Sequence, residues 1–274
     1  MGSETRTGRK VTAEEIAFYR EKGAVHLPGV LDLDWVERIR AAVDRDMADP
    51  GPLVMESTPP GNPGRLFGDM FMWTWDPEFR AVVFESPLAG AAGALMGSAE
   101  VGFLYDHLIV KEPGTSEATP WHQDLPYWPV QGEQIVTLWL ALDHVDLTNG
   151  GLEYVAGSHR WGERYEPVSF KADWKFDSSA GLPEIPDIDA ARSEHEILSF
   201  VLEPGDCIAH HALTVHGAPG NTTPGTRRRG LATRWYGSDA VYDPHPGTAR
   251  FIRRPELEPG EHLPCELFPL VLRP

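Results

Sequence analysis

Cysteine is scarce in this sequence, and long hydrophobic runs are missing. Cys207 and Cys265 are the two cysteines among 274 residues, which excludes a disulfide framework and a cysteine-rich zinc site. No segment approaches the roughly 18 consecutive apolar residues of a membrane-spanning helix. Residues 1–10 are polar and lack the apolar stretch of a secretory signal. We therefore expect a soluble protein of the reducing cytoplasm.

Positive charge is also in short supply. Lys and Arg together number 24 against 41 for Asp and Glu, which gives a net charge of −17. A chain this acidic repels phosphate backbones and anionic membranes, so we expect neither nucleic acid nor membrane as a partner. With 41% hydrophobic residues it can bury a sizeable core. A small-molecule ligand is the remaining expectation, and nothing in the pattern sets an oligomeric state.

Helix signals are concentrated in the first hundred residues. Thr12 and Glu15 form a capping box, and Gly23 is a stop signal for the helix that follows it. Asp32 or Asp34 begins a second helix, and the Ala- and Gly-rich run at residues 88–96 predicts a packed one. Between them, the Pro, Gly, Ser and Thr of residues 50–68 predict a loop. Residues 1–10 are expected to form a flexible tail, and residues 11–274 a single domain.

Short β-rich runs separated by turn signals dominate after about residue 100. They are residues 101–110, 135–142, 152–155, 197–202, 207–211 and 229–236. The dipeptide Asn149-Gly150 between two of them is a hairpin signal. Because no helices interleave with these runs, the pattern favours an antiparallel sandwich or barrel over a parallel sheet.

A histidine and a carboxylate stand two residues apart in Trp121-His122-Gln123-Asp124. If this segment is extended, His122 and Asp124 point to the same face, because side chains alternate along a strand. An imidazole and a carboxylate on one face can provide two ligands of a divalent metal ion.

The third ligand is expected from a histidine-dense segment that contains His210, His211 and His216. We favour His216, because it lies where a strand runs into the turn at residues 217–221, and a metal at a strand end can keep open positions. Two histidines and one carboxylate suit a non-haem Fe(II) that binds a cosubstrate and O₂ together. Structural zinc sites are instead closed by four ligands rich in sulfur.

An arginine-rich segment follows at residues 227–229. Arginine binds a carboxylate through two parallel hydrogen bonds. On a strand, Arg228 shares a face with Gly230 and Ala232, whose small side chains would leave space for a ligand. Arg234 lies farther along the same face. The alternative is that these arginines are solvated or pair with surface acids.

Together with their flanking residues, these motifs resemble the phytanoyl-CoA dioxygenase family of Fe(II)- and 2-oxoglutarate-dependent oxygenases. The matching segments are residues 111–114, 122–129, 139–143, 149–153, 157–159, 216–221 and 228–232, after an opening helix–strand–helix at residues 12–43. They follow the family's order and cover most of the chain.

The resemblance implies a mainly β fold, the double-stranded β-helix or jelly-roll barrel of the cupins, with N-terminal and flanking α-helices. It implies that His122, Asp124 and His216 bind iron at the open end of the barrel. An arginine of this family holds the distal carboxylate of 2-oxoglutarate. Counting from the second histidine indicates Arg227, whereas the strand pattern and the shared face indicate Arg228, which we favour.

The resemblance also suggests further contacts. The expected cosubstrate contacts are Trp139, Tyr105 and His107, and the expected substrate contacts are Trp128, Phe71 and Trp73. For the aromatic residues at 67–75, core or lid packing is the alternative interpretation. Substrate specificity is expected from the loops at residues 50–75 and 161–195.

The implied reaction converts 2-oxoglutarate and O₂ to succinate and CO₂ while an unactivated C–H bond of a metabolite or natural-product intermediate is oxidised, most simply by hydroxylation. Halogenating relatives have a small residue in place of Asp124, so the carboxylate argues against halogenation. Two alternatives stay open: a cupin-type metalloenzyme that does not use 2-oxoglutarate, and a non-catalytic barrel that binds a small molecule. The acidic charge favours a neutral or cationic substrate over a CoA thioester.

Overall fold

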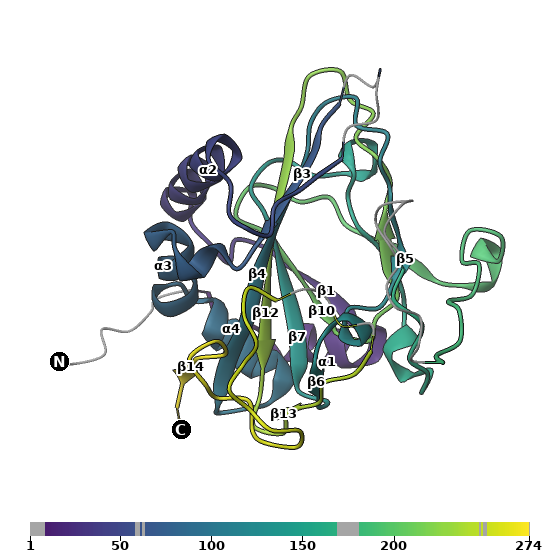
Figure 1. Ribbon diagram of the computed structural model, residues 1–274. Coiled ribbons are helices and arrows are strands. Elements are labelled where there is room, and N and C mark those ends of the chain that lie inside the picture. Colours follow the sequence, from purple (N-terminus) through teal and green to yellow (C-terminus); the bar gives the residue numbers. More distant parts are fainter. Residues whose placement is uncertain are drawn as a thin grey trace.

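Two antiparallel sheets form the centre of the molecule in a computed structural model that describes residues 9–57, 61, 64–168, 181–246, 248 and 251–273 (Figure 1). The larger sheet has the order β1 (Ala24–Leu27), β10 (Cys207–His211), β7 (Ile135–Ala141), β12 (Arg228–Tyr236), β4 (Val101–Lys111), β3 (Leu66–Met70) and β2 (Met55–Ser57), and β14 (Leu270–Leu272) pairs with β4. The smaller sheet has the order β5 (Thr119–His122), β11 (His216–Ala218), β8 (Glu153–Val155) and β9 (Ile197–Ser199), while β6 (Val130–Gln131) pairs with β13 (Val241–Tyr242). The predicted mainly β jelly-roll architecture is confirmed. Within the described ranges, no strand of the larger sheet pairs with a strand of the smaller one. The two sheets therefore form a sandwich with an open edge.

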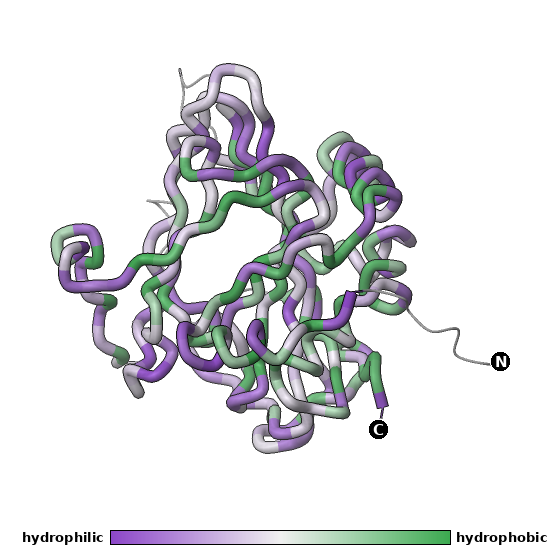
Figure 2. Tube along the Cα trace, turned by 180° about the vertical axis from the view of Figure 1, so that it is seen from behind, coloured by the Kyte–Doolittle hydropathy of each residue, from purple (hydrophilic) through white to green (hydrophobic). Residues whose placement is uncertain are grey.

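Helices cover the outer face of the larger sheet (Figure 1). They are α1 (Ala13–Lys22), α2 (Leu33–Ala48), α3 (Pro77–Glu85) and α4 (Leu88–Met96), and single 3₁₀ turns are η1 (Met72–Thr74), η2 (Leu125–Tyr127), η3 (Leu147–Asn149), η4 (Ser158–Arg160) and η5 (Arg192–Glu194). The predicted capping box is present, since Thr12 accepts from the Glu15 amide and Glu15 accepts from the Thr12 amide. Asp32 caps α2, whose green and purple turns in Figure 2 show the amphipathic pattern that buries one face.

The strands of the larger sheet have two different faces. Leu138 and Leu140 of β7 pack against the helices in the main core, whereas Thr137 and Trp139 point to the opposite side and line a cavity between the sheets. This alternation follows from the two-residue period of a strand. The cavity face is therefore built from every second residue of β4, β7 and β12.

Two local predictions were wrong. Residues 50–68, predicted as a loop, contain β2 and part of β3, which pair with Met55 opposite Gly68. Pairing of β3 with β4 satisfies the backbone there and overrides the loop-like composition. The Asn149-Gly150 hairpin is absent from the described structure, because Asp146 caps η3 and the chain then crosses from β7 in the larger sheet to β8 in the smaller one.

Part of the tail expected at residues 1–10 contacts the rest of the chain. Arg9 donates a hydrogen bond of 2.7 Å to the carbonyl of Pro28 and pairs with Glu15, while residues 1–8 lie outside the described residues. Parts of the expected specificity loops, residues 58–60, 62–63 and 169–180, also lie outside them. Every helix within the described ranges is too short or too polar to span a lipid bilayer.

Candidate metal centre

Three buried side chains converge between the sheets. One ligand atom from each of His122, Asp124 and His216 lies within 4.8 Å of the other two. His122 is the last residue of β5 and His216 the first of β11, and the two strands pair with these residues opposite one another. The pairing sets the two imidazole rings 4.2 Å apart, measured between their centroids.

Asp124 reaches the centre by a turn and not by strand alternation. Its backbone is helical, with φ −74° and ψ −43°, and η2 begins at the next residue. The extended segment that we took as the condition for a shared face therefore ends at His122, although the two side chains do meet. The turn brings Oδ1 of Asp124 to 3.8 Å from Nε2 of His122.

Backbone carbonyls fix the orientation of both imidazoles. Nδ1 of His122 donates to the carbonyl of Pro120 at 2.8 Å, and Nδ1 of His216 donates to that of Thr214 at 2.9 Å. A carbonyl can only accept, so Nε2 is the nitrogen that presents its lone pair to the centre. Burial lowers the pKa of His122 to about 3 and that of His216 to about 4, which keeps both rings in the neutral form that binds metals.

Two further side chains form hydrogen bonds to the carboxylate of Asp124. Thr137 Oγ1 donates to Oδ2 at 2.7 Å, and His210 Nε2 donates to the same oxygen at 3.1 Å. His210, one of the three candidate histidines, therefore binds the carboxylate and not the centre itself. Burial by itself would raise the pKa of Asp124, but Arg234 and His210 hold it well below its usual value. An ionised carboxylate with Oδ1 facing the two histidines is the result.

A cavity that is open to solvent on one side surrounds this centre. Its other lining residues are largely apolar or aromatic: Met55, Met70, Tyr105, Ile109, Tyr127, Trp128, Trp139 and Leu152. His107, Arg228 and Arg234 supply polar groups. Such a concave, mostly apolar site with a few convergent polar groups is typical of small-molecule binding.

The neighbouring arginines of β12 face opposite sides of the sheet. Arg228 is 2% exposed, lines the cavity and lies over Trp139, with 5.5 Å between its Cζ and the ring centroid. Its Nη1 donates to the carbonyl of Ile109 at 3.2 Å, while its Nε has no partner among the described residues. Burial lowers the pKa of Arg228 to about 10, so it stays charged at neutral pH.

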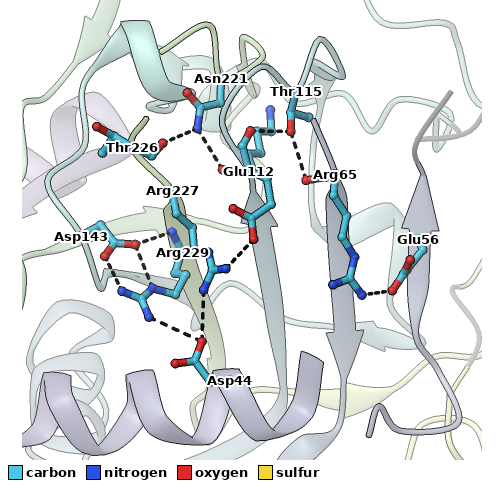
Figure 3. A network of polar contacts seen from close by, with 11 residues as sticks. Asp44, Glu56, Arg65, Glu112, Thr115, Asp143, Asn221, Thr226, Arg227 and Arg229 are labelled. Atoms are coloured by element: carbon cyan, nitrogen blue, oxygen red, sulfur yellow. Dashed lines mark hydrogen bonds and ion pairs between the residues drawn. The ribbon is translucent and has the colours of Figure 1, made fainter. Parts of the chain in front are cut away.

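Arg227 instead belongs to a network of ion pairs (Figure 3), and its side chain is 37% exposed. It pairs with Asp44 at 3.1 Å and with Glu112 at 2.7 Å, and Arg229 pairs with Asp143. Pairing with surface acids was the alternative interpretation of these arginines, and it holds for Arg227, whereas the Asp143 partner of Arg229 is itself buried. The structure gives no support to Arg227 as a contact of a bound cosubstrate.

The space predicted beside Arg228 is filled. A Cβ atom on Gly230 would lie 2.1 Å from the ring of Trp139, so the missing side chain of Gly230 accommodates this indole. Trp139 then forms the floor beneath Arg228. The small residue makes room for an aromatic wall of the cavity and not directly for a ligand.

The remaining predicted residues divide into two groups. Tyr105, His107 and Trp128 line the cavity, and Trp128 Nε1 donates to the hydroxyl of Tyr105 at 2.6 Å. Phe71 and Trp73 do not belong to its lining. Phe71 stacks behind Tyr105 with ring centroids 5.0 Å apart.

The left-handed backbone of Phe71, with φ 65°, turns the chain at the end of β3. Trp73 consequently packs in the outer core, where its ring meets that of Phe103 edge-on at 6.0 Å. The structure gives no support to Phe71 and Trp73 as substrate contacts, and both side chains pack in the hydrophobic core.

Sequence reasoning assigned no role to two residues of the site. Arg234 places Nη2 3.8 Å from Oδ1 of Asp124, and its position on the face of Arg228 was the signal that could have found it. Thr137 carries no such signal, because a threonine in a hydrophobic strand is ordinary. Its contact with Asp124 depends on the packing of β7 against η2.

The model of the phytanoyl-CoA dioxygenase (PhyH) family matches residues 19–230. The chain belongs to this family. The assignment confirms the predicted resemblance, and with it the predicted class of non-haem iron, 2-oxoglutarate-dependent dioxygenases.

The peroxisomal phytanoyl-CoA dioxygenase of Mus musculus is 26% identical to this PhyH chain over 231 residues, which cover 80% of the chain and 66% of the mouse protein. The multifunctional dioxygenase prhA of Penicillium brasilianum is 25% identical, covering 81% of the chain and 71% of the fungal protein.

Solved structures of similar proteins agree with this assignment. The non-haem, α-ketoglutarate-dependent carbocyclase SnoK from nogalamycin biosynthesis is 27% identical, with a TM-score of 0.76 over 95% of this PhyH chain and 96% of SnoK. The epimerase SnoN, solved in complex with Fe³⁺, α-ketoglutarate and nogalamycin RO, is 25% identical, with a TM-score of 0.70 over 94% of this chain and 97% of SnoN. These relatives share a class of cofactor but differ in the reaction that they catalyse.

Proposed function

We propose that the protein binds Fe(II) through His122, Asp124 and His216 and uses 2-oxoglutarate and O₂ to oxidise a C–H bond of a small molecule. The observation that carries this proposal is the convergence of these three side chains on a cavity that also contains a buried arginine. Two neutral imidazoles and one ionised carboxylate match the donors of non-haem Fe(II) oxygenases and leave other positions open. Hydroxylation is the simplest reaction of this kind.

Iron with 2-oxoglutarate and O₂ supplies the oxidising chemistry when bound, with succinate and CO₂ as the products of the cosubstrate. The chain's own contribution is to position these groups and to exclude water. Thr137 and His210 orient Asp124 through one carboxylate oxygen, which leaves the other for the metal. No protein nucleophile takes part.

Arg228 is the residue that we assign to the distal carboxylate of 2-oxoglutarate. It is a buried cation on the cavity wall, and its unpartnered Nε fits a ligand that binds through two parallel hydrogen bonds. Trp139 lies beneath it and borders the same ligand. Tyr105 and His107 face the cavity closer to the metal centre, where they contact the bound small molecules together with Trp128.

The substrate is proposed to be a small molecule with a largely apolar body. The lining of the cavity supports this proposal, and so does the complex of the related SnoN with nogalamycin RO. A cupin-type metalloenzyme that does not use 2-oxoglutarate has the same ligands but no need for a buried arginine at Arg228. A non-catalytic barrel has no need for the three converging ligands.

Anaerobic reconstitution with Fe(II) and 2-oxoglutarate tests the proposal. The expected result is a visible metal-to-ligand charge-transfer band in the wild type, its loss in His216→Ala and its retention in His211→Ala. His211 is a matched control because it follows His210 on β10 yet bonds to the carbonyl of Glu133, away from the centre. A wild type that binds Fe(II) without developing the band points to the cupin alternative, and one that binds no Fe(II) points to the non-catalytic barrel. Succinate formation on admission of O₂ then measures turnover.

A further inference from the structure

A second buried arginine stands next to the metal centre. Arg234 lies on β12 opposite Tyr105 of β4 and Thr137 of β7, so its side chain enters the cavity from the middle of the larger sheet. It is 6% exposed. Arg234 lies six positions after Arg228, which corresponds to about 20 Å along a strand at about 3.3 Å per residue. The two guanidinium groups therefore start from different ends of the cavity wall.

The guanidinium of Arg234 is fixed in place by aromatic rings. Its Cζ lies 4.5 Å from the ring centroid of Tyr105 and 5.4 Å from that of Trp128. Trp128 and Tyr105 are in turn joined by a hydrogen bond of 2.6 Å. Cation–π contacts of this kind hold the plane of an arginine without using its N–H donors.

Most donors of Arg234 lack a partner. Nε and Nη1 make no hydrogen bond to any part of the chain that the structure describes. Nη2 has only long contacts, 3.5 Å to Nδ1 of His107 and 3.8 Å to Oδ1 of Asp124. Buried polar groups are ordinarily satisfied, and a guanidinium carries five donors. A rigid, buried cation on the wall of a ligand cavity, with donors that the chain leaves unsatisfied, indicates a binding position for an oxygen-rich group.

The charge of the cavity favours an anion at this position. Among the described lining residues, Arg228 and Arg234 are the cations and Asp124 is the carboxylate, which leaves one positive charge in excess. Fe²⁺ and the dianion of 2-oxoglutarate cancel one another, so the excess persists in the loaded site. The net charge of −17 argued for a neutral or cationic substrate, but exposed acids are screened within about 8 Å at physiological salt. The buried charges of the cavity therefore determine which charge a bound substrate is expected to carry.

The rest of the wall is largely apolar and continues into a second, smaller cavity. The two share Met55, His107, Ile109 and Thr119, and the second extends below β2 and β3 along Leu66 and Phe67. An apolar body can therefore extend away from the metal while an acidic group remains beside it.

We propose that Arg234 is a specificity-determining residue that binds a carboxylate of an otherwise apolar substrate next to the iron. The proposal rests on the proposed function for the identity of the metal and the cosubstrate. It differs from the role of Arg228, which is assigned to 2-oxoglutarate.

Three bicyclic probes of one shape test this assignment: 2-naphthoate, 2-naphthalenemethanol and 2-naphthylmethylamine. Their dissociation constants are measured by calorimetry on the anaerobic Fe(II)- and 2-oxoglutarate-loaded protein. We expect naphthoate to bind about tenfold or more tightly than the alcohol, as a charge-assisted hydrogen bond replaces a neutral one, and the amine to bind most weakly. Arg234→Gln should abolish this preference, and Arg234→Lys should retain part of it.

Separate measurements distinguish the other roles that Arg234 could have. In Arg234→Gln, measured at saturating Fe(II), the affinity for 2-oxoglutarate should change less than threefold, whereas Arg228→Gln should lose 2-oxoglutarate affinity. The proposal is overturned if the wild type shows no preference for naphthoate, if the preference survives in Arg234→Gln, or if that variant loses 2-oxoglutarate affinity instead. Titration of the metal-free protein separates the two proposals, because the naphthoate preference there depends on Arg234 and not on iron chemistry.

Discussion

Replacing Arg228 by glutamine should specifically weaken the binding of 2-oxoglutarate. Arg228 is 2% exposed, so its removal would leave the distal carboxylate of the cosubstrate buried without a partner. Truncating one member of a buried charge pair costs about 2–5 kcal/mol, which is roughly 30-fold to 4000-fold in Kd at about 1.4 kcal/mol per tenfold. Lys111 lies buried nearby, and burial together with Arg228 holds its pKa well below the usual value. Loss of Arg228 would favour the charged form of Lys111, so we expect the lower part of this range, about 30-fold to 300-fold.

The assay is an anaerobic titration of the Fe(II) protein with 2-oxoglutarate, followed by the charge-transfer band and by calorimetry. Arg227→Gln is the matched control, because the side chain of Arg227 is 37% exposed and pairs with surface acids. Surface pairs contribute about 0–1 kcal/mol, so its Kd should change by less than about fivefold. Equal effects of the two substitutions, or a threefold effect at Arg228, would refute the assignment. Fe(II) affinity should be the same in both variants.

Three further predictions concern neighbouring groups. Gly230→Ala should lower 2-oxoglutarate affinity and cost about 1–3 kcal/mol of stability, because its Cβ would lie 2.1 Å from the ring of Trp139 and force the ring into the cavity. Thr137→Val removes the donor to Asp124 with little change in shape, and should weaken Fe(II) binding about 10-fold to 100-fold in a chelator competition. In urea titrations, the free energy of unfolding should fall less steeply between pH 4 and 8 in Asp106→Asn than in the wild type. The reason is that burial raises the pKa of Asp106 from 3.8 to about 8.

The sign of the last effect follows from proton binding. Folded Asp106 keeps its proton up to about pH 8, whereas the unfolded chain releases it near pH 3.8. The stability contribution is therefore complete below pH 3.8 and is lost as the pH rises toward 8. A slope that is identical in wild type and Asp106→Asn would contradict this account. Unchanged 2-oxoglutarate affinity in Gly230→Ala, or unchanged Fe(II) affinity in Thr137→Val, would contradict the other two.

Local features of the fold were determined by the sequence alone. The capping box of Thr12 and Glu15 and the stop at Gly23 formed as predicted, because each depends on residues within a few positions of one another. The main strands were also predictable, since alternation of side chains is a local property. The family motif named His122, Asp124 and His216 as candidates, and it also pointed to an arginine near residue 227.

Tertiary structure decided which of these residues meet. His122 and His216 lie far apart in the chain and come together only through the register of β5 against β11. Arg227 precedes β12 and Arg228 is its first residue, so the two differ in parity, but the packing of helices on one sheet face decides which of them is inside. Thr137 and Arg234 reach Asp124 across strands, and no local pattern encodes such contacts because their energy arises from side chains of distant segments. The sequence therefore determined the kinds of groups available, and the pairing of distant strands determined their geometry.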